Sequence, residues 1–121
     1  MAKRKKLLFI SRSAPYGADR ARALLDMALA ASVYEQDIEL LFLGDGVYQL
    51  LRDQDGGRIG EKTLGNAMEA LELYGIENPL VEAAALEERS LRAEDLVIST
   101  VALDAGGIRD LIGNSDVVFN L

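Results

Sequence analysis

The chain has 121 residues, of which 50% are hydrophobic and 27% are charged, the composition of one ordinary globular domain. Its net charge of −7 argues against nonspecific binding of nucleic acid, because neutralising phosphates requires a basic surface. It contains no cysteine and no histidine, which excludes disulfides, thiolate nucleophiles and metal sites built from Cys or His. The composition therefore leans away from catalysis, since only carboxylates, Lys, Arg, Tyr, Ser and Thr remain for chemistry.

Lys3–Lys6 is the only cluster of basic residues, and it precedes the apolar run Leu7–Ile10. Such a cluster can be a nucleic-acid tail, the start of a signal peptide or the solvated flank of a strand, and we favour the flank. The run is too short for the apolar core of a signal peptide, and no segment is long enough to span a membrane. We therefore expect a cytoplasmic protein that binds neither membrane nor nucleic acid directly.

The first half of the chain alternates strands with helices. It predicts a strand at Lys6–Ser11, an alanine-rich helix from about Asp19 to Tyr34, a strand at Ile38–Leu43 and a short helix at Val47–Leu51. Abundant alanine on one helix indicates close packing against a sheet or against another chain. The polar, glycine-rich segment Arg52–Lys62 that follows predicts a surface loop.

The second half continues the alternation. It predicts a helix at Thr63–Tyr74 ended by Gly75, a strand at Leu80–Ala84, a helical turn at Leu86–Arg89, a strand at Leu96–Thr100, a helix at Leu103–Ile112 and a strand at Asp116–Leu121. We interpret Glu87-Glu88-Arg89 as a solvated face. Together the elements predict a single α/β domain around a five-stranded, mostly parallel sheet with right-handed crossovers.

Asp45 lies between Gly44 and Gly46, directly after the dense apolar run of the second strand. The carboxyl ends of strands in an open parallel sheet are where sites usually lie. Asp45 can therefore be a general base, a metal ligand or the N-cap of the short helix, and a metal site needs more converging oxygen ligands. We favour the N-cap, and we expect Gln49, among apolar residues, to face a partner rather than solvent.

The loop Ser11–Gly17 follows a strand and opens a helix, where backbone amides can hold an anion with help from Arg12 and Arg22. The competing interpretation is a tight connection with Arg22 paired on the helix surface. The sequence contains neither a G-x-G-x-x-G after the first strand nor a G-x-x-x-x-G-K-[ST] motif. A small module that binds anions or nucleotides stays open as an alternative.

Several segments, in order over essentially the whole chain, carry a resemblance to one family. They are Ser13–Gly17, Arg22 with Leu25-Asp26, Asp45–Leu51, Leu73–Ile76, Leu86–Leu91 and Ser115–Val118. The chain resembles the DsrE/DsrF-like sulfur-relay family, and within it the TusC (DsrF) branch. The segment D-G-V-Y-Q-L-L is the most specific part, and Ser90 stands where the branch usually has glycine.

The resemblance implies a three-layer α/β sandwich that works as a non-catalytic subunit. In that family TusB-, TusC- and TusD-type chains form a heterohexamer, a dimer of heterotrimers, which passes persulfide sulfur between carrier proteins toward 2-thiolation of the wobble uridine in certain tRNAs. Such transfer needs a thiolate, so the resemblance implies that the transfer cysteine lies in the TusD-type partner. The sequence is also compatible with a subunit of a DsrEFH-type complex of sulfur oxidation and with a stand-alone homo-oligomeric adaptor.

We predict no catalytic, cofactor-binding or metal-binding residue in this chain. The alanine-rich helix and the tyrosine-bearing segment after Asp45 are the candidates for subunit contacts, since aromatic residues often anchor interfaces. The candidate interface or structural residues are Tyr16, Arg22, Asp45, Gly46, Val47, Tyr48, Gln49 and Leu50.

Overall fold

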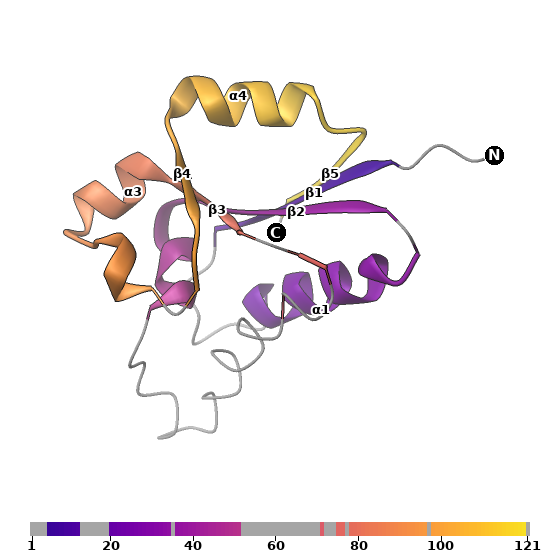
Figure 1. Ribbon diagram of the computed structural model, residues 1–121, viewed down its shortest axis with the longest axis horizontal. Coiled ribbons are helices and arrows are strands. Elements are labelled where there is room, and N and C mark those ends of the chain that lie inside the picture. Colours follow the sequence, from indigo (N-terminus) through magenta and orange to yellow (C-terminus); the bar gives the residue numbers. More distant parts are fainter. Residues whose placement is uncertain are drawn as a thin grey trace.

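A computed structural model describes residues 5–12, 20–34, 36–51, 71, 75–76, 78–96 and 98–120. Their five strands form one sheet in the order β4-β3-β2-β1-β5, and neighbouring strands are parallel (Figure 1). The strands are β1 Lys6–Ser11, β2 Asp37–Phe42, β3 Leu80–Glu82, β4 Val101–Leu103 and β5 Val117–Asn120. The predicted five-stranded α/β sheet is confirmed.

The two longest strands, β1 and β2, form the centre of the sheet. They pair over their whole length, from Lys6 opposite Asp37 to Ser11 opposite Phe42. Both have the continuous apolar runs of strands that are covered on two faces. On its other side β1 pairs with β5, and the ring of Phe9 stacks on that of Phe119 with 4.7 Å between the centroids.

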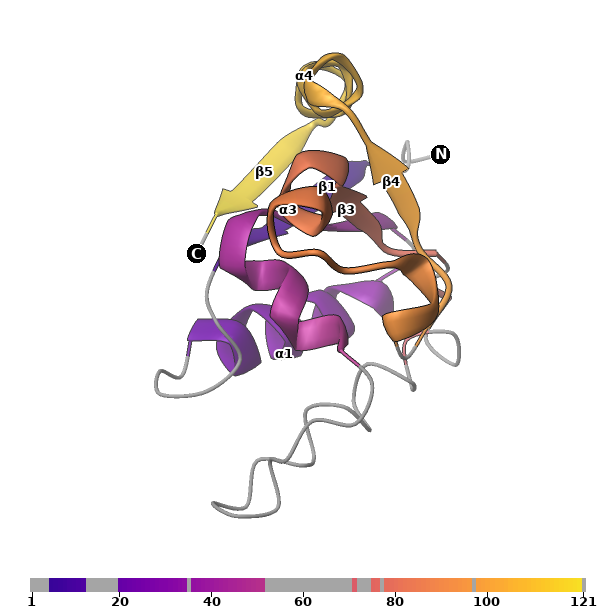
Figure 2. The same cartoon turned by 90° about the vertical axis from the view of Figure 1, so that its left-hand side faces the viewer.

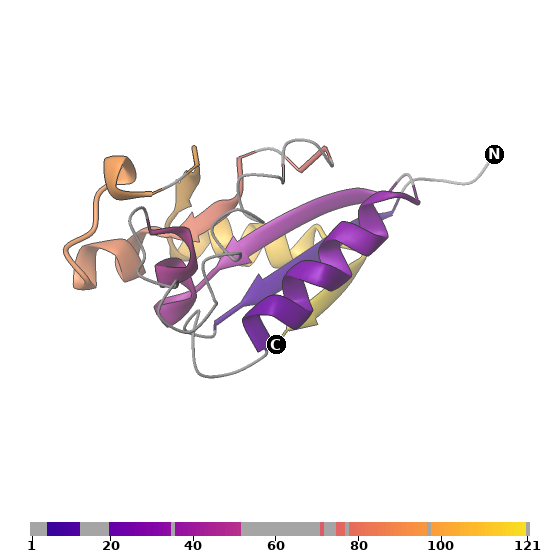
Figure 3. The same ribbon diagram turned by 90° about the horizontal axis from the view of Figure 1, so that it is seen from below.

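Helices cover both faces of the sheet and make three layers, as the resemblance implied (Figures 1 and 2). Helix α1 (Arg20–Ser32) runs across β1 and β2 on one face, where Leu24, Leu25 and Ala28 are buried (Figure 3). Helix α4 (Ala105–Gly113) covers the other face and has no buried residue of its own. The main core therefore lies between the sheet and α1.

Two short helices lie beyond the carboxyl ends of the strands (Figure 1). The first, η1 (Gly44–Leu50), is a 3-10 helix after β2, and the second, α3 (Ala83–Glu88), is an α-helix after β3. Both contribute buried side chains to the α1-side core, among them Val47, Leu50 and Leu86. The carboxyl edge of the sheet is thus covered by elements that belong to the core.

The predicted strand at Leu96–Thr100 is wrong, because the fourth strand lies at Val101–Leu103. Before it lies the short 3-10 helix η4 (Ala93–Asp95). The Asp95 carboxylate caps its start by accepting from the backbone N–H of the N-cap residue Arg92 at 2.8 Å. Leu96 is buried and forms an isolated antiparallel bridge with Leu51. An apolar run identifies burial here but not a strand.

The predicted third strand is too long at its end. Ala83 and Ala84 begin α3 instead, in keeping with the high helix propensity of alanine. The last helix contains the adjacent glycines Gly106 and Gly107 without a break, and Asp104 caps its start by accepting from Gly107 N at 2.7 Å. The other predicted elements that lie within the described residues are confirmed to within a few residues.

The predicted loop Arg52–Lys62 lies outside the described residues, and so does the predicted helix Thr63–Tyr74 apart from Leu71. Gly75 has a φ of 80°, and Ile76 N donates to Leu71 O at 3.0 Å. A positive φ with such a bond is typical of a glycine at the C-cap, the role that the sequence predicted for Gly75. Among the described helices, none is long and apolar enough to cross a membrane.

Candidate functional site

A helix begins almost directly after β2, with only Leu43 between them. The 3-10 helix η1 begins at Gly44, earlier than the predicted start at Val47, and Leu43 occupies the N-cap without a side-chain hydrogen bond. Asp45 therefore lies inside the first turn, and its predicted role as the N-cap is wrong. Two glycines so close to the strand end allow the chain to turn at once, with Gly44 at a φ of 52°.

The Asp45 carboxylate holds α3 instead. It accepts hydrogen bonds from Arg89 Nη2 at 2.9 Å and Arg89 Nε at 3.3 Å. Arg89 also donates to Ala85 O at 3.1 Å, and its guanidinium lies 5.7 Å from the centroid of the Tyr48 ring. The hydrogen bond to Asp45 raises the pKa of Arg89, with partial burial acting against it. This ion pair links the first turn of η1 to the end of α3.

A buried polar contact ties η1 to the end of β1. Gln49 Nε2 donates to Ser11 Oγ at 2.6 Å, and the two residues are 1% and 2% exposed. Polar groups at that depth require hydrogen-bond partners, and these two satisfy each other in part. The expectation that Gln49 faces a partner subunit is therefore corrected, because its side chain points into its own chain.

Gly46 is held against the same strand end. A Cβ atom at this position would lie 2.2 Å from the carbonyl oxygen of Ser11, a contact that no side chain can make. The third strand is joined to η1 as well, since Gly44 N donates to Glu82 Oε1 at 3.0 Å. The ends of β1, β2 and β3 are thereby fixed around one short helix.

The segment Asp45–Leu50, predicted to contact other subunits, contains both buried and exposed side chains. Val47, Gln49 and Leu50 are buried in the chain, so they are structural and not available to a partner. Asp45 is exposed and Tyr48 is half-buried. Only these two of the predicted η1 residues present side-chain atoms at the carboxyl edge.

The remaining predicted residues are less fully described. Tyr16 lies outside the described residues, and Arg22 lies in α1 with a side chain that is not described. Arg12 is exposed at the end of β1. Residues 13–19, which would form the anion-binding loop, are not described, so that alternative stays a prediction.

Three residues of this site were missed from the sequence. Ser11 was expected as the end of a strand and the start of a loop, Glu82 as part of a longer strand and Arg89 as part of a solvated face. Arg89 and Asp45 are 44 positions apart, and no local pattern signals such a contact. A useful signal would have been that Asp45 and Arg89 belong to short helical segments that directly follow strands. A parallel sheet brings the carboxyl ends of its strands to one edge.

The site consists of carboxylates, a guanidinium, an amide and a hydroxyl, arranged to hold backbone elements together. The described residues include no group of three or more acidic side chains that could hold a metal ion. The exposed part is small and consists of Asp45 with part of Tyr48, whose ring lies under the Arg89 guanidinium. Such an arrangement can present a rigid surface to another molecule.

Comparison with known sequences gives consistent matches over nearly the whole chain. The sequence model of the DsrE/DsrF-like family matches residues 5–121. A TusC homolog of Pseudomonas aeruginosa is 36% identical over 117 residues, which cover 97% of this chain and 98% of that protein. A TusC homolog of Vibrio parahaemolyticus is 39% identical over 105 residues, covering 87% and 89%. The intracellular sulfur oxidation protein DsrF of Allochromatium vinosum is 33% identical over 130 residues, covering 96% of each chain.

Among solved structures, the crystal structure of the YchN protein from E. coli has the same fold. The two superpose with a TM-score of 0.84 over 97% of this chain and 99% of that one. Their sequences are 19% identical, so the likeness concerns the fold alone.

Proposed function

The chain belongs to the DsrE/DsrF-like family, in its TusC (DsrF) branch, and we propose that it is a non-catalytic subunit of a TusBCD-type sulfur-relay complex. That complex passes persulfide sulfur toward 2-thiolation of the wobble uridine of tRNA. The observation that carries the proposal is a full-length match to TusC homologs in a chain without cysteine. Persulfide transfer requires a thiolate, so a neighbouring subunit must supply it.

The proposed partners are TusB-like and TusD-like chains in a cytoplasmic heterohexamer, a dimer of heterotrimers. The transfer cysteine lies in the TusD-like chain, and sulfur-carrier proteins meet the complex there. The described site supports a structural role for this chain, because most of its polar side chains hold η1 against the sheet and α3. The chain then contributes a fixed surface beside its partner's chemistry.

Co-expression with the TusB-like and TusD-like chains of the same organism tests the proposal. The three chains should co-elute as one complex in size-exclusion chromatography and remain together at moderate salt. The matched control replaces this chain by its Gly113→Ala variant, which changes an exposed glycine at the far end of α4 and should co-elute equally. Elution of this chain apart from both partners would overturn the proposal.

The DsrF match gives a second candidate, a DsrEFH-type complex of sulfur oxidation. The two pathways differ in the final acceptor of the sulfur. Introducing the chain with its partners into cells that lack their own relay complex should restore 2-thiouridine in tRNA, measured by mass spectrometry of nucleosides. A correctly assembled complex that restores none would favour the sulfur-oxidation candidate.

A further inference from the structure

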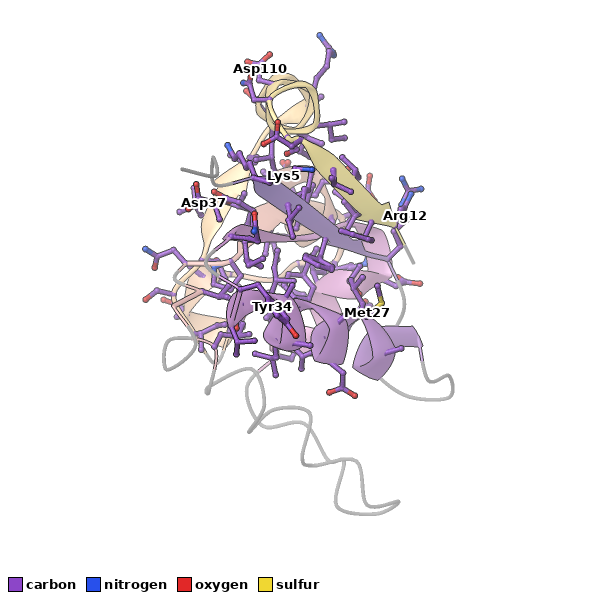
Figure 4. The ribbon with its side chains drawn as sticks, turned by 90° about the vertical axis from the view of Figure 1, so that its right-hand side faces the viewer. Lys5, Arg12, Met27, Tyr34, Asp37 and Asp110 are labelled. Atoms are coloured by element: carbon purple, nitrogen blue, oxygen red, sulfur yellow. The ribbon has the colours of Figure 1, made fainter. Side chains whose placement is uncertain are left out.

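Asp45 and Gly46 are joined by an aspartyl-glycyl bond, the dipeptide at which aspartate isomerises most readily. The backbone nitrogen of the following residue can attack the side-chain carboxyl carbon, and glycine has no side chain to hinder the attack. Asp37 and Asp110 are exposed as well (Figure 4), but a branched apolar residue follows each of them. Among the described residues, Asp45 is the one aspartate that glycine follows.

The fold requires both residues of this bond. A Cβ atom at position 46 would lie 2.2 Å from the carbonyl oxygen of Ser11, so only glycine fits there. The Asp45 carboxylate holds the end of α3 by accepting from Arg89. Neither residue can be exchanged without the loss of a contact, so the bond must be protected by its surroundings and not by its sequence.

Isomerisation at this bond proceeds through a cyclic imide. The Gly46 nitrogen bonds to Asp45 Cγ while the bond from Cγ to one carboxylate oxygen breaks. That oxygen leaves as water, with the amide proton and one proton from solvent. Water then opens the ring, and attack on the backbone carbonyl carbon of Asp45 leaves the chain linked through Cγ as isoaspartate. Attack at Cγ restores aspartate, and water is the only co-reactant.

Two contacts oppose the closure of this ring. Gly46 N donates to Leu43 O at 2.8 Å, which holds the attacking amide within the helical hydrogen bonding of η1. The carboxylate is held on the other side, with Oδ1 of Asp45 2.9 Å from Nη2 and 3.3 Å from Nε of Arg89. Ring closure requires both contacts to open, because the nitrogen and Cγ must turn toward each other.

Arg89 is a fixed anchor rather than a mobile surface cation. Its side chain is only 18% exposed, it also donates to Ala85 O at 3.1 Å, and its guanidinium lies over the Tyr48 ring. The Asp45 side chain is 60% exposed, so the pair contributes little to stability. Its position beside the reactive bond gives it a second role, which is to slow a covalent reaction.

We infer that Asp45 is a latent site of isoaspartate formation, and that Arg89 protects it by holding the carboxylate away from the Gly46 nitrogen. An isoaspartate adds one methylene to the backbone and moves Gly46 off the Ser11 carbonyl. The contacts that fix η1 to β1 and α3 are then lost. This chemistry belongs to the chain itself and does not depend on the proposed function.

Ageing of the full-length protein tests the inference. Wild type and Arg89→Gln are incubated at physiological temperature and pH and then digested. Liquid chromatography with mass spectrometry separates the aspartate and isoaspartate peptides, which have equal mass but different retention. Isoaspartate at position 45 should accumulate several-fold faster in Arg89→Gln. The second aspartyl-glycyl bond, Asp55–Gly56 in the predicted loop Arg52–Lys62, is the internal reference and should react equally in both proteins.

A second variant keeps the test valid if Arg89→Gln does not fold. Arg89→Lys retains the positive charge but not the two donors that hold one carboxylate oxygen, so it should raise the rate at position 45 by a smaller factor. Rates equal to that of wild type in both Arg89 variants would overturn the inference.

Two controls separate protection by Arg89 from general loosening. Ser11→Ala weakens the attachment of η1 through Gln49 and leaves the Arg89 contact in place. Arg92→Gln removes an exposed arginine that pairs with Glu94. Arg92→Gln should age as wild type does, and Ser11→Ala should stay well below Arg89→Gln. Isoaspartate formation in Ser11→Ala as fast as in Arg89→Gln would overturn the inference, because loosening of η1 would then account for the reaction.

Discussion

The two faces of the sheet differ in how firmly their helices are attached. On the α1 side, one continuous core joins the sheet to α1, η1 and α3. On the α4 side, the buried residues of the described chain are Leu8, Ile10 and Leu41, and α4 packs against them with half-buried side chains. The stability of the domain is therefore expected to depend mainly on the α1 side, where the candidate site also lies.

Both faces leave apolar side chains exposed, but in different patterns. On the α4 side the exposed apolar residues belong to three different elements, as Val101, Ile112 and Val118. On the α1 side they lie close together in the sequence, as Met27 in α1 with Val33 and Tyr34 just beyond its end. The exposed large apolar side chains of the α1 side are thus confined to one helix and the turn that follows it.

Matched substitutions of glycine give the largest expected contrast between the two sides. Gly46→Ala places a Cβ atom against the Ser11 carbonyl, a backbone group that cannot rotate away. We expect a loss of about 4 kcal/mol in the free energy of unfolding, above the usual range for overpacking. Gly113→Ala meets no atom within 4 Å and should be neutral or stabilising. Urea unfolding of both variants measures the difference, and equal midpoints would contradict it.

Matched substitutions of serine should give an intermediate contrast. Ser11→Ala leaves the buried amide of Gln49 without its hydroxyl partner, and we expect a loss of about 2 kcal/mol. Ser115→Ala removes a half-buried hydroxyl that donates to Leu111 O at 2.7 Å, and we expect a loss of about 0.5 kcal/mol. Thermal and urea unfolding check both values. A larger loss at Ser115 would reverse the comparison between the faces.

Removing the exposed ion pair should have the smallest effect. Asp45→Asn should lower the melting temperature slightly, because Arg89 keeps its bond to Ala85 O and its position by the Tyr48 ring. Glu94→Gln, which removes the charge partner of solvated Arg92, should change it even less.

The pH dependence of this pair follows from the direction of the pKa shift. The Asp45 contact raises the pKa of Arg89 above its ordinary value, so the contribution of the arginine is complete below that value. It is lost only as the pH rises through the raised pKa in strong alkali. The difference between wild type and Asp45→Asn should therefore stay constant from neutral to moderately alkaline pH, and a difference that disappears there would refute this assignment.

The strands that were best predicted are those whose apolar runs are both long and paired along their whole length. The bounds of β1 agree with the sequence prediction because Leu7–Ile10 is one continuous run between polar residues. The prediction failed at Leu96, since burial against Leu51 needs an apolar side chain but no strand. It also failed for β3, where alanine favours the helix.

The site was predicted in its location but not in its contacts. The position of Asp45 after a buried strand led to the correct edge of the sheet. Its partner Arg89 is 44 residues away, and the Gln49 and Ser11 pair spans 38 residues. Contacts of that separation depend on the order of the strands in the sheet, which local sequence patterns do not encode.

The central claim is that this chain supports sulfur transfer without carrying the sulfur. Intact-mass spectrometry of the reconstituted complex after exposure to a persulfide donor tests it most directly. We expect an added sulfur on the TusD-like chain, none on this chain, and a transfer to the downstream carrier that falls to the level of the donor alone when this chain is omitted. Stable sulfur on this chain, or undiminished transfer without it, would contradict the account.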